Sequence, residues 1–431
     1  MKVNVIELLV KKDHCIGCGV CAALCPQQVL SMRFNDLGVY QPYESPGCLD
    51  NCKLCLEICP FYEENPGKKQ IGAELFAQED AQFHPDIGYL LSTFVAYNKN
   101  ENERLKSASG GAGYALLRGL MENNLVDAVI APIANPDPEM LFKYSVIKEK
   151  ESLSKTRGSV YYPLQLYDVL RYVLKNEGSY AITVLPCMAK ALRLAQSKNS
   201  KLRKRLRYVI GLVCGQMKSK HFTEELAKIA IGTKQLRTIN YRIKQINKPS
   251  SNFAFEFKGL NGEIAYLYWK DEINLFWSYR YFTTMACNQC DDVFAETADI
   301  ALMDAWLPEY TSDYRGNNLI VARNRKLIDL LKNDKSISIS NISWQRIRDS
   351  QKSVIENKKA FSGKSNDLLL KMIAEMKKEI QKMSNIDYHN NRKKINKLVK
   401  TIKSLERARN VITIPKRILT RIERKRLRDT K

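Results

Sequence analysis

The sequence predicts a chain of three parts: a small cysteine-rich α+β unit, an α/β core and a basic α-helical tail. Eight of the twelve cysteines fall between Cys15 and Cys59. From about residue 94 to residue 231, short strand-like apolar runs alternate with segments of helical apolar spacing. This alternation favours an α/β layer with a largely parallel sheet. Residues 391–431 hold 16 Lys and Arg against 3 Asp and Glu, which is +13 of the net charge of +23.

Length and composition indicate a globular protein of several domains. The 431 residues suffice for two or three domains of about 150 residues each, and an apolar fraction of 45% can fill their cores. No apolar run approaches the roughly 18–20 residues that span a bilayer, and the N-terminus is too short and too polar for a signal peptide. We therefore expect a cytoplasmic protein, in which cysteines bind metal more often than they form disulfides. Because the excess charge lies mostly in the tail, no nucleic-acid partner is expected.

Two closely spaced cysteine motifs occupy the N-terminal unit. They are Cys15-x2-Cys18-x2-Cys21-x3-Cys25-Pro26 and Cys48-x3-Cys52-x2-Cys55-x3-Cys59-Pro60. Thiolates at this spacing can bind three corners of a 4Fe–4S cluster from one loop, and the fourth cysteine then binds the other cluster. We expect Cys59 to complete the first set and Cys25 to complete the second. Zinc is the alternative, but zinc ribbons use two separated CxxC pairs.

The doubled motif resembles the bacterial-type dicluster ferredoxin. This resemblance predicts an α+β ferredoxin-like domain over residues 1–66 that holds two 4Fe–4S clusters. The chain departs from the usual pattern in one place, where three residues instead of two separate Cys48 from Cys52.

The core is expected to begin with strands near Phe94–Tyr97 and Val126–Ile130 around a helix from Ala112 to Leu120. Strands over 181–185 and 208–213 follow, each succeeded by a helix, and alternation over 253–285 predicts a hairpin. From about Ser340 the apolar spacing becomes helical and the composition basic. The expected elements therefore place a βα-type core between the cysteine-rich unit and the tail.

Four further cysteines lie in the core. Cys187 follows the expected strand 181–185, and Cys214 follows residues 208–213 directly. If both strands belong to one parallel sheet, the two thiols emerge at its carboxyl edge, where open α/β folds bind ligands. Cys287-x2-Cys290 would approach the same edge from a loop. Buried apolar thiols are the alternative, but the Pro before Cys187, the Gly after Cys214 and the CxxC pair favour a third cluster.

A glycine-rich turn precedes the expected helix at Ala112. It reads Ser107-Ala108-Ser109-Gly110-Gly111-Ala112-Gly113. N–H groups at a helix N-terminus favour an anion, so a phosphate of a nucleotide or flavin would fit. The turn has neither the GxGxxG nor the Walker pattern, and a Ser-capped, Gly-rich turn by itself is more often only a helix start.

These segments occur in an order that resembles one family. They are SASGG (107–111), RGSVYY (157–162), LPCMAKALR (185–193), GLVCG (211–215) and CNQCDDVFAETADIALMDAW (287–306). Over roughly residues 10–320 the chain resembles the family of coenzyme F420 hydrogenase/dehydrogenase beta subunits, with a ferredoxin domain fused ahead. The resemblance implies an FAD-binding α/β core with a 4Fe–4S cluster beside the flavin. The flavin-binding residues it implies are Ser107, Ser109, Gly110, Gly111, Gly158 and Ser159; no catalytic residue is assigned.

The resemblance also divides the rest of the chain. It implies that residues 67–165 form the N-terminal region typical of these beta subunits. Residues 166–335 would form their C-terminal region, with the third cysteine set, and residues 336–431 a basic helical tail. The tail is expected to be a solvated helix pair or to contact a partner protein or a membrane surface peripherally.

The function implied is that of an iron–sulfur flavoprotein oxidoreductase. It would pass electrons from the ferredoxin-type clusters through FAD to a small organic acceptor, a deazaflavin or another, and would work with a redox partner protein. The alternative is an electron-relay subunit without a substrate of its own. The chain has Met188, Gly215 and Met303-Asp304-Ala305 where the family usually has Gln, His and Gly-Asp-Phe. These departures lie on the expected substrate side and bear on the choice of substrate.

Overall fold

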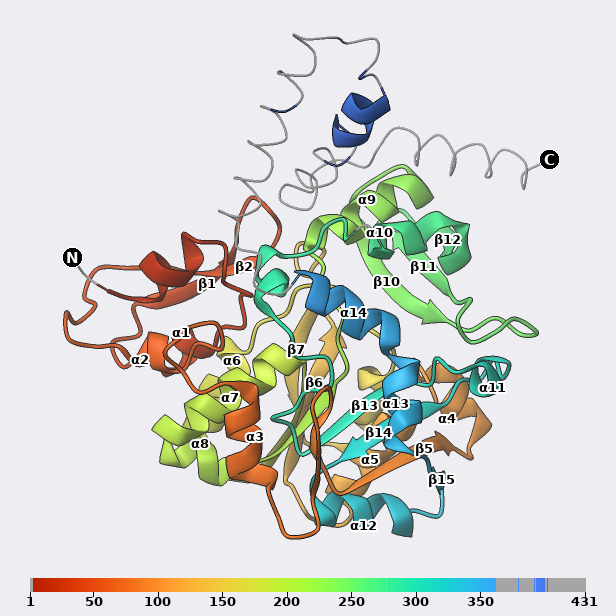
Figure 1. Cartoon of the computed structure of the whole chain (residues 1–431), viewed down its shortest axis with the longest axis horizontal. Coiled ribbons are helices and arrows are strands. Elements are labelled where there is room, and N and C mark those ends of the chain that lie inside the picture. Colours follow the sequence, from red (N-terminus) through yellow and green to blue (C-terminus); the bar gives the residue numbers. More distant parts are fainter. Residues whose placement is uncertain are drawn as a thin grey trace.

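The computed structural model describes residues 3–278, 280–361, 379, 391, 393–399 and 401. Most of the basic tail expected over 336–431 therefore lies outside the described residues. Within the part of the chain that is described, no helix is both long enough and apolar enough to cross a membrane. Figure 1 shows the N-terminal unit at one side of a large α/β body, and a smaller sheet at the opposite side.

The N-terminal unit is small and mixes helices with one hairpin. Its elements are η1 (Ile6–Val10), α1 (Val20–Leu24), β1 (Leu30–Phe34), β2 (Tyr40–Glu44) and α2 (Leu54–Glu57). β1 and β2 pair antiparallel, which confirms the predicted α+β character. The polar connection that follows contains α3 (Lys68–Phe76) and the hairpin β3 (Gln82–His84)–β4 (Gly88–Leu90).

The main sheet has eight strands in the order β15-β5-β14-β13-β9-β8-β6-β7. In that order they span Ile337–Asn341, Ser92–Asn98, Asn318–Ala322, Ile300–Asp304, Leu206–Leu212, Tyr180–Val184, Ala128–Ala134 and Phe142–Ile147. The four central strands β13, β9, β8 and β6 run parallel. The flanking pairs are antiparallel. The α/β core predicted from the sequence is thus confirmed, with a parallel centre and antiparallel edges.

Helices cover both faces of this sheet. On one face lie α5 (Ala112–Glu122), α12 (Arg325–Asn333) and η2 (Lys150–Thr156), which share a buried apolar cluster. The other face carries α6 (Tyr167–Lys175), α7 (Pro186–Lys198) and α8 (Ser200–Arg205). Strand residues alternate between the faces: Leu302 of β13 packs in the first cluster and Met303 in the second. α4 (Glu101–Lys106) follows β5 directly.

A second, three-stranded sheet faces the carboxyl edge of the parallel strands. α9 (Lys220–Ile231) leads into β10 (Leu236–Ile243), β11 (Ala254–Gly259) and β12 (Ile264–Tyr268), all antiparallel. β11 and β12 are the hairpin predicted from period-2 alternation. After it come η3 (Trp269–Ile273), α10 (Asn274–Ser278), η4 (Met285–Gln289) and α11 (Pro308–Thr311), and the described chain closes with α13 (Trp344–Ser350) and α14 (Lys352–Phe361).

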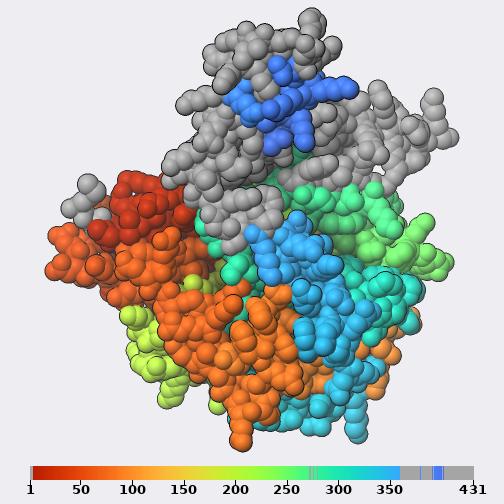
Figure 2. Space-filling view, viewed as in Figure 1, coloured from red at the N-terminus to blue at the C-terminus, as the bar shows by residue number. Residues whose placement is uncertain are grey.

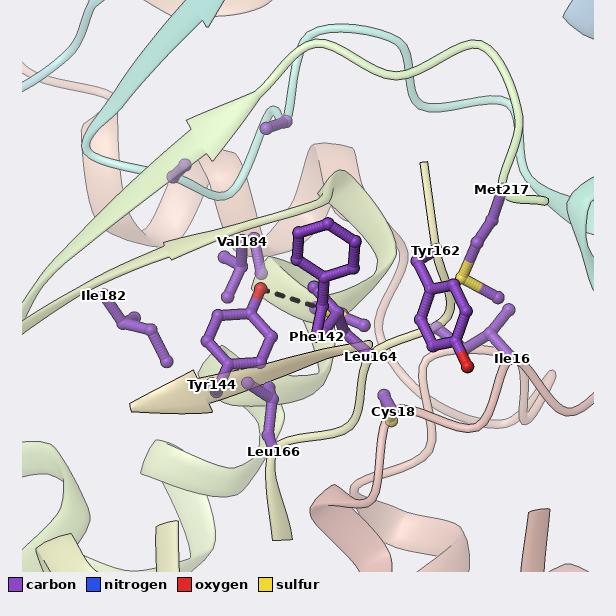
Figure 3. Packing of buried hydrophobic residues seen from close by; sticks show 14 of the residues in the cluster. Ile16, Cys18, Phe142, Tyr144, Tyr162, Leu164, Leu166, Ile182, Val184 and Met217 are labelled. Carbon is purple, nitrogen blue, oxygen red and sulfur yellow. Dashed lines mark hydrogen bonds between the residues drawn. The ribbon is translucent and has the colours of Figure 1, made fainter. Parts of the chain in front are cut away.

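The N-terminal unit packs directly on the core. Ile16 and Cys18 belong to the same apolar cluster as Tyr162 and Leu166, and Figure 3 shows these side chains close together. The N–H of Leu166 donates to the carbonyl oxygen of Cys18 at 2.8 Å. Gly19 has a φ of +76°, and a Cβ there would lie 3.1 Å from the backbone nitrogen of Tyr167, so a glycine permits this close approach. The N-terminal cysteines therefore have a defined position relative to the main sheet.

Candidate metal centres and cofactor site

The first cysteine group combines three residues of the first motif with the last residue of the second. Cys15, Cys18, Cys21 and Cys59 line one small hollow. The N–H of Gly17 donates to Cys15 Sγ at 3.4 Å. Burial raises the pKa of Cys18 to about 11 and that of Cys59 to about 12. The structure thus brings together the four thiols expected to share one cluster.

The second group contains the remaining N-terminal cysteines. Burial raises the pKa of Cys55, and the thiols of Cys52, Cys48 and Cys25 raise it further, so these four residues are electrostatic neighbours. Cys25 comes from the first motif, as expected if each motif contributes its fourth cysteine to the cluster of the other, a pattern called here the crossed arrangement. The segment around Cys48 lies at the surface, and the next residue, Leu49, is 51% exposed.

The third group forms where the parallel strands end. Cys187 is the second residue of α7, directly after β8, and Cys214 follows β9. Burial raises the pKa of Cys187 well above its usual value, and the thiols of Cys290, Cys214 and Cys287 add to the shift. The N–H of Cys214 donates to the carbonyl oxygen of Val293 at 3.2 Å, which joins the β9 end to the segment after the CxxC pair. All four later cysteines therefore gather at the predicted sheet edge.

Hydrogen-bond donors surround the sulfurs of the third group. The N–H of Met217 lies 3.3 Å from Cys287 Sγ, and the Thr284 hydroxyl lies 3.2 Å from the same sulfur. Lys358 Nζ donates to Cys290 Sγ at 3.0 Å. Donors of this kind stabilise the negative charge of cluster-bound thiolates, so the residues present fit a 4Fe–4S cluster.

The four-cysteine groups are wider than the site of a single ion. Among the described residues, no three His, Cys, Asp or Glu side chains lie close enough to share one metal ion. In a 4Fe–4S cluster each cysteine binds a different iron atom, which requires a wider separation of the sulfurs. The first group is therefore defined by a shared hollow, and the second and third by the electrostatic effect of their members on Cys55 and Cys187.

Lys190 of α7 links the first and third groups. Its Nζ donates to the carbonyl oxygen of Pro60 at 2.8 Å. Burial lowers the pKa of Lys190, while the thiols of Cys59 and Cys290 act in the opposite direction. One side chain thus lies within electrostatic range of a cysteine from each group. The three groups form a series: the second lies at the periphery, the first against the core, and the third at the sheet edge.

Arg323 holds the segment that follows the CxxC pair. Its side chain is 1% exposed. It donates to the backbone carbonyl oxygens of Ile87, Tyr89, Phe294, Ala295 and Ala298 at 2.7–3.2 Å. Because three of these carbonyls lie within eight residues of Cys290, Arg323 fixes the course of the chain beside the third group.

The glycine-rich turn lies at the same edge of the main sheet, after β5. Ser107 Oγ donates to the carbonyl oxygen of Glu103 at 2.8 Å, and Ser109 Oγ donates to that of Asn317 at 2.6 Å. Gly111, with a φ of +83°, precedes α5, whose first N–H donates to Asn318 Oδ1 at 3.0 Å. Both hydroxyl hydrogens and one helix N–H are thus used within the protein, which the sequence did not indicate.

A buried lysine fastens this turn to the second sheet. Lys244 Nζ donates to the carbonyl oxygens of Ser109 (2.6 Å), Arg104 and Arg315. Burial, assisted by Arg242 and Arg104, lowers the pKa of Lys244 to about 7. The turn is therefore held on one side by the serine contacts to backbone carbonyls and on the other by the Lys244 amine.

Arg157, at the same edge, begins the RGSVYY segment but was not among the flavin-binding residues expected from the sequence. Its guanidinium lies 4.0 Å from the centroid of Tyr114, in the first turn of α5, and its Nε is buried without a hydrogen-bond partner. Next to it, Gly158 has a φ of +101°, and a Cβ there would meet no atom within 4 Å. A buried donor beside open space fits an anionic or carbonyl-bearing ligand. A sequence signal for Arg157 was present, because it directly precedes Gly158 and Ser159, which were expected to bind the flavin.

Arg242 of β10 faces the same edge from the second sheet. Its Nη2 lies 3.1 Å from Asp304 Oδ1, at the end of β13, and its Nε is also buried without a partner. Burial, the largest single effect, lowers the pKa of Arg242, but Asp304 and Tyr161 together outweigh it, and the net shift is upward. The guanidinium lies 4.1 Å from the Phe253 ring. No motif surrounds Arg242, so only the fold reveals its position.

Family models match most of the chain. A 4Fe–4S dicluster domain matches residues 7–75. The N-terminal and C-terminal models of the coenzyme F420 hydrogenase/dehydrogenase beta subunit match residues 93–171 and 178–343. The cysteine groups and these matches define an iron–sulfur electron-transfer protein of the oxidoreductase class. The chain belongs to the family of coenzyme F420 hydrogenase/dehydrogenase beta subunits, with a dicluster domain at its N-terminus.

Named relatives are similar over most of this chain. The F420H2 dehydrogenase of Methanosarcina mazei has an F subunit that is 22% identical over 345 residues, which is 77% of this chain and 86% of that protein. The coenzyme F420-dependent sulfite reductase of Methanocaldococcus jannaschii is 24% identical over 340 residues, 74% of this chain but 45% of that protein. A solved chain of the F420-reducing NiFe hydrogenase complex from Methanosarcina barkeri aligns with a TM-score of 0.50 at 17% identity, covering 65% of this chain and 93% of that chain. The similarity to the solved hydrogenase chain shows that the two chains share a fold.

Proposed function

We propose that this chain is a flavin-dependent iron–sulfur oxidoreductase that exchanges electrons between a redox partner protein and a small organic substrate. The observation that carries the proposal is the position of Lys190, whose Nζ donates to the carbonyl oxygen of Pro60 and which lies within electrostatic range of Cys59 and of Cys290. Because electron transfer slows steeply with distance, adjacent groups in series provide a path. The path leads from the exposed segment around Cys48 to the carboxyl edge of the main sheet.

Each cysteine group would hold one 4Fe–4S cluster, which supplies one-electron steps when bound. The protein's part is to exclude water from the thiols and to direct N–H and amine donors at them. The exposed segment around Cys48 would receive the partner protein, since the second group lies farthest from the sheet edge.

The edge beside the third group would hold FAD, which exchanges one electron with clusters and two with organic substrates. Arg157 and Arg242 offer buried Nε donors without partners. Gly158 and Ser159 border open space next to Arg157, and the Ser107–Gly111 turn would shape the pocket wall more than it donates hydrogen bonds. Asp304 would keep Arg242 charged and in place.

A deazaflavin is the substrate class proposed first, because the names of two relatives specify coenzyme F420. One observation favours the alternative of an electron-relay subunit without its own substrate. Met188 is 1% exposed, and a Cβ at Gly215 would lie 3.3 Å from Val354 of α14. Two of the positions at which the chain departs from its family are therefore enclosed.

The Cys187→Ser variant tests the proposal. Anaerobically reconstituted protein should lose one cluster and lose turnover with the acceptor, while the two N-terminal clusters remain. Wild-type protein should be screened with a deazaflavin and with other organic acceptors. Unchanged turnover in Cys187→Ser would place the third group off the path and contradict the proposal. Reduced clusters that no organic acceptor reoxidises would favour the relay.

A further inference from the structure

The segment that follows the family match supplies a buried amine to the third cysteine group. The match ends at residue 343, and α13 and α14 come after it. Lys358 of α14 is 4% exposed. Its Nζ donates to Cys290 Sγ at 3.0 Å and to the carbonyl oxygen of Asp292 at 2.6 Å. The amine is therefore fixed against a sulfur of the third group and the backbone that follows it.

Contacts along α13 and α14 keep this amine in place. Arg348 Nε and Lys359 Nζ donate to the two oxygens of Asp86 at 2.8 and 2.6 Å. Gln351 Nε2 donates to the carbonyl oxygen of Asp304 at 3.3 Å. Figure 1 shows α14 crossing the body close to α13, and Figure 2 shows blue atoms of this region at the surface beside an orange segment. The helix is thus seated independently of Lys358.

Another buried amine, that of Lys218, donates to backbone carbonyls and not to a sulfur of this group. Lys218 is 1% exposed, and its Nζ donates to the carbonyl oxygens of Phe276 at 3.0 Å and Tyr281 at 2.7 Å. Lys358, in contrast, is directed at a sulfur. Reduction adds one negative charge to a 4Fe–4S cluster, and a cation or donor at a ligand sulfur stabilises that added charge.

We infer that Lys358 is a positioning residue that raises the reduction potential of a cluster held by Cys187, Cys214, Cys287 and Cys290. The C-terminal extension thereby sets the direction of electron flow between this cluster and its neighbours. The inference rests on the proposed function in one respect, namely that the third group holds a 4Fe–4S cluster.

Redox titration of the full chain, reconstituted anaerobically and followed by EPR, tests the inference. The signal of the third cluster is identified by its loss in Cys187→Ser. Lys358→Met should shift the one-electron equilibrium of this cluster at least tenfold toward the oxidised form. This corresponds to a reduction potential lowered by about 59 mV or more. Lys358→Arg, which keeps a charged donor, should recover most of the shift. Lys352→Met, which removes an exposed amine of the same helix, is the matched control and should leave all potentials unchanged.

An unchanged potential in Lys358→Met, with the iron content retained, overturns the inference, and so does an equal shift in Lys352→Met. If Lys358→Met does not load the third cluster, Lys358→Gln carries the same comparison: a lowered potential supports the inference, and an unchanged one overturns it. Wild-type protein with only about eight irons would instead show that the third group holds no cluster, and this would contradict the proposed function.

Discussion

The two N-terminal motifs exchange their fourth cysteines in the structure, and paired alanine variants test this exchange. Cys59 lines a hollow with Cys15, Cys18 and Cys21, while Cys25 and Cys52 are both electrostatic neighbours of Cys55. A group that loses one cysteine can retain an incomplete cluster, so two cysteines are replaced at once. Cys18→Ala/Cys59→Ala removes two members of one group; Cys52→Ala/Cys59→Ala removes one member from each of two groups.

The expected loss of iron in each variant follows from four irons per cysteine group. With three groups, the wild-type chain should contain about twelve irons. Cys18→Ala/Cys59→Ala should fall to about eight, with the second and third groups intact. Cys52→Ala/Cys59→Ala should damage both N-terminal clusters and leave intact only the third. The assay is iron quantitation combined with EPR of the dithionite-reduced protein. If Cys52→Ala/Cys59→Ala instead loses one cluster and retains the other N-terminal signal, each motif binds its own cluster, and the crossed arrangement is refuted.

Two further predictions concern stability. Arg323→Met removes the donor of four buried carbonyls and one half-buried carbonyl and should lower the free energy of unfolding by about 3–5 kcal/mol. The exposed Arg325→Met, whose partner is Asp80, should cost less than about 1 kcal/mol. Similar guanidinium chloride midpoints for the two variants would contradict the role of Arg323. Lys244→Met tests a pH dependence. Because the pKa of Lys244 is about 7 in the folded protein and 10.5 in model compounds, the folded state binds this proton more weakly. The stability of the wild type relative to Lys244→Met should therefore rise from pH 7 to pH 10, and a constant difference would show that Lys244 is not perturbed.

Several features of the site follow from local sequence. The cysteine spacing alone indicates the crossed groups, because the geometry of a cluster limits which thiols can share it. Cys187 and Cys214 each follow an apolar strand run, and adjacent parallel strands necessarily bring their carboxyl ends to one edge. The hairpin of β11 and β12 follows from period-2 alternation.

Other features depend on contacts between distant segments and have no local signal. Lys358 reaches Cys290 from 68 residues away, and Arg242 meets Asp304 across two sheets. The sequence indicated a strand near Phe94–Tyr97, which is β5, but it indicated neither β14 and β15 nor the antiparallel pairing that extends the parallel centre. The hydroxyls of Ser107 and Ser109 looked available for a phosphate, but backbone carbonyls of the α4 end and of the segment before β14 accept their hydrogens. Such pairings are decided by tertiary packing.

The quantity that tests the account most directly is the cofactor content of the full chain purified and reconstituted anaerobically. Iron and flavin should be measured on the same sample, per chain. We predict about twelve irons and one FAD per chain. About eight irons without flavin would contradict it, leaving a two-cluster electron carrier whose α/β body serves only as a scaffold.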